Sequence, residues 1–218
     1  MQLKCKCFFA GHDLQTDSII NYSPELKWMN DKVTMPKDVK NFVVVEGINA
    51  LNIINCPILN SKSSIVEILN HKVSLYEFPE QKLIICVAEE KDLNYFSVIT
   101  ELLKPWIEIA ENVNCVSIQS LSEYKHKDQQ EGCLIRGIKS NLKDVPALEV
   151  PNFITGLSAG IASYRKFKNL SYSVYIAYVD IFDIFSVKAI LELLKKLELP
   201  YNENVKVRAL HQKSDLYM

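Results

Sequence analysis

The sequence carries one pattern that is typical of a catalytic serine. Residues 156–160 read Gly-Leu-Ser-Ala-Gly, which matches the Gly-x-Ser-x-Gly motif that places the nucleophile of α/β hydrolases on a tight turn between a strand and a helix. The chain order of a triad is also present, because Ser158 is followed by Asp180 or Asp183 and then by His211. A small serine hydrolase that uses Ser158 is therefore one candidate function.

The residues around this motif argue against hydrolysis. Pro151 lies in the segment just before the serine, and a proline cannot donate a hydrogen bond within a central strand, so the strand that the motif requires is not predicted. His211 falls in a polar stretch near the end of the sequence, where a general base would be poorly held. We therefore interpret Gly156 and Gly160 as residues that allow close helix packing, and we expect no catalytic residue.

The last three residues form a second pattern. Leu216, Tyr217 and Met218 combine an apolar residue, a tyrosine and a final residue that would carry the free carboxylate. An apolar pair at the tip of a polar segment is unfavourable in water unless a partner surface receives it, and a lysine in a pocket would pair with the carboxylate. A frayed chain end is the alternative interpretation of the same residues.

Composition excludes several other classes of function. The 218 residues include 25 Lys and Arg against 26 Asp and Glu, a net charge of −1, whereas nucleic-acid-binding proteins usually carry a positive surplus. The six cysteines include no Cys-x-x-Cys pair, so we expect reduced thiols and no metal site. No Gly-x-Gly-x-x-Gly motif indicates a dinucleotide, and we expect no cofactor.

The sequence also contains no signal peptide and no apolar stretch long enough to span a membrane. A cytoplasmic protein, present also in the nucleus, is the expectation.

Short apolar runs that alternate with amphipathic segments predict the elements that position these residues. Strands are expected at 42–45, 73–78, 83–88, 115–118, 133–138 and 172–179. Helices are expected at 92–107, at 153–167 and from Ser186 to Leu197, with Pro105 kinking or breaking the first and Ser186 capping the last.

This alternation predicts a single-domain α/β protein, a three-layer sandwich with a largely parallel central sheet. Residues 1–200 would form its core, and residues 201–218 would form a flexible C-terminal tail.

Several of these segments resemble the proteasome assembly chaperone 1 family. Residues 150–154, Val-Pro-Asn-Phe-Ile, match it together with the helix of small residues that follows and the strand that ends at Asp180. Residues 41–50, Asn-Phe-Val-Val-Val-Glu-Gly-Ile-Asn-Ala, are similar to the family's first core strand and turn. The resemblance covers 42–218, but the region before it is short and lacks the family's long charged extension.

The resemblance implies a chaperone without enzymatic activity. Such a protein pairs with proteasome assembly chaperone 2, and the heterodimer binds the ring of proteasome α subunits while the 20S core is assembled. Tyr217 would lodge between two α subunits, Leu216 would cover its apolar flank, and the Met218 carboxylate would pair with a lysine. A catalytically silent domain that resembles nucleoside phosphorylases and binds small molecules is a third interpretation of the chain.

Overall fold

A computed structural model describes residues 27–28, 38–47, 50–54, 63–68, 71–88, 93–125, 133–179 and 184–202. The expected docking residues Leu216, Tyr217 and Met218 lie outside the described residues. Asp180, Asp183 and His211, the hydrolase candidates, lie outside them too. In chain order the elements are β1 (Lys27–Trp28), β2 (Asn41–Gly47), α1 (Ala50–Ile54), β3 (Ser63–Ile68), β4 (His71–Phe78), η2 (Pro79–Gln81), β5 (Leu83–Ala88), α2 (Leu93–Ile109), β6 (Asn112–Ser120), η3 (Leu121–Glu123), β7 (Cys133–Ile138), α3 (Gly156–Phe167), β8 (Ser173–Val179) and α4 (Ile184–Lys196).

The strands within the described ranges form one mixed sheet in the order β1-β3-β4-β5-β2-β6-β8-β7. The four central strands β5, β2, β6 and β8 run parallel to one another. The flanking pairs β1–β3, β3–β4, β4–β5 and β7–β8 are antiparallel. For β3–β4 and β4–β5 the reason is the short connection, because only antiparallel neighbours can be joined by so few residues. The predicted α/β class with a parallel centre is confirmed, and the antiparallel flanks add to it.

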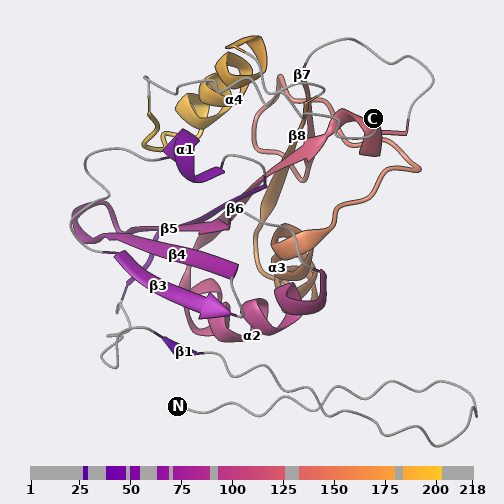
Figure 1. The fold of residues 1–218 in the computed structure, drawn as a ribbon. Helices are drawn as coiled ribbons and strands as arrows, with labels where there is room; N and C mark the ends of the chain where they lie inside the picture. The colour runs from indigo at the N-terminus through magenta and orange to yellow at the C-terminus, as the bar shows by residue number, and fades with distance from the viewer. Residues whose placement is uncertain are drawn as a thin grey trace, which may run out of the picture.

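The central strands are apolar on both faces, as strands covered by helices on two sides must be. In β2, Phe42 and Val44 belong to one core cluster, and Val43 and Val45 belong to another. Helices α2 and α3 cover the first face of the sheet, and α1 and α4 cover the second, as Figure 1 shows. The result is the three-layer sandwich that the sequence predicts.

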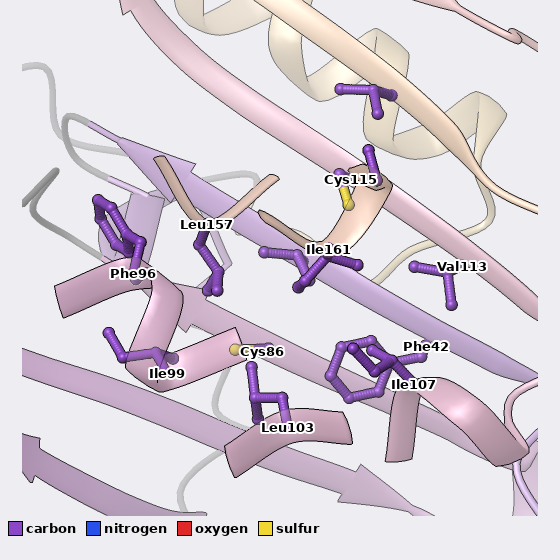
Figure 2. Packing of buried hydrophobic residues seen from close by; sticks show 14 of the residues in the cluster. Phe42, Cys86, Phe96, Ile99, Leu103, Ile107, Val113, Cys115, Leu157 and Ile161 are labelled. Carbon is purple, nitrogen blue, oxygen red and sulfur yellow. The ribbon is translucent and has the colours of Figure 1, made fainter. Parts of the chain in front are cut away.

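The first cluster fixes α3 against the sheet and α2. Leu157 and Ile161 of α3 point toward the side chains of α2, including Leu103, and the ring of Phe42 lies beside Ile107 (Figure 2). All five side chains are buried. Each buried side chain of this size contributes about 1.5–3 kcal/mol, so the position of α3 is held mainly by this apolar contact.

Two details of the helices differ from the sequence-based expectation. Helix α2 continues through Pro105 to Ile109, so a break there is wrong and the kink stays a prediction. Leu103, Trp106 and Ile107 around Pro105 are buried, and this tertiary packing offsets the lost hydrogen bond. Ser186 is not the cap of α4, since that helix begins at Ile184 and Ser186 is buried within its first turn.

Candidate functional site

The Gly-x-Ser-x-Gly motif forms the first turn of α3. Gly156 has a φ of +77°, a left-handed conformation that a residue with a side chain adopts only with strain. A Cβ atom at this position would lie 2.8 Å from Glu46 Oε2, so the position also lacks room for a side chain. The segment before Gly156 is not a strand, which agrees with the expectation drawn from Pro151.

Glu46, at the end of β2, meets this helix start. Its Oε2 atom accepts a hydrogen bond of 2.7 Å from the main-chain N–H of Leu157. A carboxylate at the N-terminus of a helix is favoured by the helix dipole and satisfies a free N–H. Burial raises the pKa of the Glu46 carboxyl, while the hydroxyls of Ser158 and Ser117 and the Leu157 N–H oppose that rise.

Ser158 itself is inaccessible. Its relative exposure is 0%. Its Oγ atom makes no hydrogen bond of ordinary geometry, although the hydroxyl lies close enough to the Glu46 carboxyl to lower the pKa of that group. A nucleophile on a hydrolase turn must instead present its hydroxyl to substrate. The arrangement around Ser158 therefore joins a strand to a helix and offers no path for a substrate.

Gly160, the second glycine of the motif, lies against α2. A Cβ atom on Gly160 would come within 2.5 Å of Thr100 Oγ1, and that hydroxyl donates a hydrogen bond of 2.7 Å to the Phe96 carbonyl. The interpretation of Gly156 and Gly160 as residues that allow close packing is confirmed.

Arg165 is a buried charge that the sequence analysis did not single out. Its guanidinium donates to the carbonyls of Ile107 at 2.6 Å, Ala110 at 2.9 Å and Ser171 at 2.6 Å. It thereby satisfies carbonyl groups at the end of α2, which a helix leaves without partners. Its role is structural, and a lone arginine in a helix gives no signal in the sequence for it.

The last described residues, Tyr201 and Asn202, lie on the α1–α4 face of the sheet. Tyr201 packs against the second core cluster, and the main-chain N–H of Asn202 donates to the Ile53 carbonyl at 2.8 Å. Leu216, Tyr217 and Met218 are beyond this point, so their docking role and the tail boundary stay predictions.

A groove of about 570 Å³ lies on the same face, at the amino ends of β2, β5 and β6. Its walls combine the amides of Asn41, Asn114 and Asn141 with apolar residues such as Leu83 and Leu197. Among the described residues that line it, Lys40, Tyr175 and Lys196 carry polar end groups, and histidine, cysteine and serine are absent.

Charged and sulfur-containing groups form no metal centre in the part of the chain that the structure describes. Cys86 and Cys115 are buried free thiols, as expected, and burial raises the pKa of both. Within the same ranges, no helix has the length and apolar character needed to cross a bilayer.

Exposed apolar residues lie in the loop before α3. Val150 is 93% exposed and Phe153 is 62% exposed. Asn152, which lies between them in the sequence, makes several hydrogen bonds to neighbouring segments. These residues belong to the block 150–154 on which the family resemblance rests.

Comparison with known proteins establishes the fold. No protein-family profile matches the sequence, and no curated protein matches it either. Among solved structures, PbaA of Pyrococcus furiosus, described as an archaeal homolog of proteasome-assembly chaperone, is 17% identical over 85% of each chain, with a TM-score of 0.54. A protein of unknown function from Thermoplasma acidophilum is 14% identical, covers 80% of this chain and 81% of its own, and has a TM-score of 0.50. The chain therefore has the single-domain α/β fold of these proteins.

Proposed function

We propose that this chain is a proteasome assembly chaperone without enzymatic activity. It acts as a heterodimer with proteasome assembly chaperone 2 and binds the α-subunit ring of the 20S core during assembly, in the cytoplasm or the nucleus. The observation that carries this proposal is the fold shared with PbaA along 85% of both chains. The resemblance of 41–50 and 150–154 to the chaperone family and the burial of Ser158 support it.

The proposed docking group is the sequence Leu216, Tyr217 and Met218. Burial of one apolar side chain contributes about 1.5–3 kcal/mol, and a charge-assisted hydrogen bond contributes a similar amount. Ordering each tail residue costs about 1–2 kcal/mol, so the tail alone binds weakly. Tight binding then depends on the folded domain and the partner acting together with the tail. The charge-assisted hydrogen bond of the tail requires that Met218 carries the free carboxylate.

Tail variants test this function. We expect that removal of residues 216–218, the change Tyr217→Ala, and the addition of one residue after Met218 each weaken binding of the heterodimer to α-ring intermediates. Asp215→Ala is the matched control, because it alters the same segment outside the tripeptide and should bind as the wild type does. If the deletion, Tyr217→Ala and the extension all bound as tightly as the wild type does, the docking role would be overturned.

A further inference from the structure

The loop before α3 holds two apolar side chains in solvent. We call residues 149–153 the ridge; within it, Val150 is 93% and Phe153 is 62% exposed. Single exposed apolar residues are common on protein surfaces, but two of them in one short loop that the rest of the fold holds in place are not explained by folding.

Asn152 holds the ridge in place. Its Oδ1 atom accepts from the main-chain N–H of Lys125 at 2.6 Å, and its Nδ2 atom donates to the carbonyls of Lys125 at 3.3 Å and Glu149 at 3.0 Å. Its own main-chain N–H donates to the Glu149 carbonyl at 2.9 Å. One side chain thus ties the ridge to the segment that follows β6.

Glu149 anchors the start of the ridge to β7. Its carboxylate accepts from Arg136 Nε at 2.9 Å and from the hydroxyl of Tyr124 at 2.9 Å. Burial alone would raise the pKa of Glu149, but its hydrogen bonds and the Arg136 charge outweigh burial and lower it. The carboxylate is therefore charged at neutral pH, and the ion pair persists there.

A loop that is already ordered loses little conformational entropy when it binds, which raises affinity for a given contact area. Val150 and Phe153 project from this ordered loop, and neither is needed to fill the core. The hydrogen bonds of the ridge therefore prepare an apolar contact for another molecule.

One positive charge, that of Lys125, lies beside the exposed ring of the ridge. Lys125 Nζ lies 5.1 Å from the centre of the Phe153 ring, and the negative charge of Glu149 is paired with Arg136. A partner surface that receives the ridge would therefore combine an apolar pocket with carboxylates at its rim.

The ridge and the start of the tail lie on opposite faces of the sheet. Leu148 and Ile154, on either side of the ridge, pack against the α2–α3 cluster. Leu199 and Tyr201, which precede the tail, pack against the α1–α4 cluster. The chain thus presents the ridge on a different face of the sheet from Leu199 and Tyr201.

We propose that the ridge is the surface by which this chain binds its partner chaperone, through an apolar pocket with an acidic rim on that partner. Val150 and Phe153 enter the pocket, and Lys125 meets the carboxylates. A partner at the ridge presupposes the heterodimer proposed above.

The test is the affinity of the full chain for purified proteasome assembly chaperone 2. We expect the double variant Val150→Ser and Phe153→Ala to bind at least roughly tenfold more weakly, because central apolar contacts dominate most interfaces. Phe167→Ala is the matched control, since Phe167 is 80% exposed at the far end of α3, and it should bind as the wild type does.

Lys125→Glu provides a second variant that leaves the apolar residues in place. It should weaken binding and remove much of the salt dependence that the wild type shows. Thermal unfolding of each variant shows whether its fold is intact. If the double variant does not fold, the affinity of Lys125→Glu for the partner tests the ridge in its place.

The outcomes separate this inference from the proposed function. Equal affinity of the wild type and the ridge variants would overturn the ridge alone and leave the chaperone function standing. Failure of the wild type to bind either the partner or α subunits would overturn both. A homodimer that only the ridge variants dissociate, measured by light scattering, would assign the ridge to a second copy of this chain and would overturn the stated partner.

Discussion

The main-chain N–H of Leu157 donates a 2.7 Å hydrogen bond to the carboxyl group of Glu46, a residue 111 positions earlier in the chain. This contact joins the end of the central strand β2 to the start of α3. It explains why a motif typical of hydrolases occurs in a chain whose serine is buried: Gly156 provides the left-handed conformation and the space that the Glu46 carboxyl occupies.

Glu46→Gln should remove a pH dependence of stability. Burial raises the folded-state pKa of Glu46 above the ordinary value of 4.5, so the unfolded chain releases this proton at lower pH than the folded chain does. The wild type is therefore most stable, as far as this group is concerned, below pH 4.5, and it loses stability as the pH rises from there through the folded-state pKa.

Urea unfolding over a series of pH values measures this effect. The difference in free energy of unfolding between wild type and Glu46→Gln should shift in favour of the variant as the pH rises, because glutamine keeps an acceptor for Leu157 without the charge. Two parallel pH profiles would show that Glu46 does not titrate differently in the folded protein.

Gly156→Ala should destabilise the fold. An alanine at a φ of +77° carries a strain of about 1–3 kcal/mol, and its Cβ would press on the Glu46 carboxyl. Ser163→Ala, at an exposed position of the same helix, is the control and should change stability little. Chemical unfolding that gave equal midpoints for the two variants would contradict the role assigned to Gly156.

Ser158→Ala should leave the protein folded, with a stability within about 1 kcal/mol of the wild type, because the buried Oγ atom makes no hydrogen bond of ordinary geometry. The native protein should also not react with a fluorophosphonate probe. Labelling of Ser158 that disappears in Ser158→Ala would instead favour the hydrolase interpretation.

Arg165→Met should cost about 3 kcal/mol or more, because it leaves buried carbonyl groups of Ile107 and Ala110 without donors. Arg165→Lys should recover only part of this loss, since an ammonium group lacks the planar fork that reaches several carbonyls at once. Lys166→Met, at the exposed neighbouring position, is the control. Differential scanning calorimetry measures the stability of the three variants. Equal losses of stability in all three would contradict the role assigned to the hydrogen bonds of Arg165.

The sequence predicts the central elements well, because strands such as β2 and β8 are continuous apolar runs and α3 and α4 are clearly amphipathic. Their class and order follow from local patterns. The strand directions at the sheet edges follow less directly, since they depend on which strands meet across the sheet.

The site is harder to predict, because its contacts join distant segments. Glu46 at the end of an apolar run signals a special role only when α3 is known to begin beside it. Asn152 and Lys125 are likewise 27 positions apart, and neither residue type predicts their pairing. Pro105 indicates a helix end by local rules, yet burial of its neighbours overrides that preference.

Reconstitution of the α ring tests the central claim most directly. Purified α subunits, proteasome assembly chaperone 2 and this chain are mixed, and the assembly intermediates are separated by native electrophoresis and identified by mass spectrometry. We predict that this chain co-migrates with α-ring intermediates together with its partner, and that Tyr217→Ala reduces this association. Intermediates that form equally well without this chain and never contain it would contradict the proposed function.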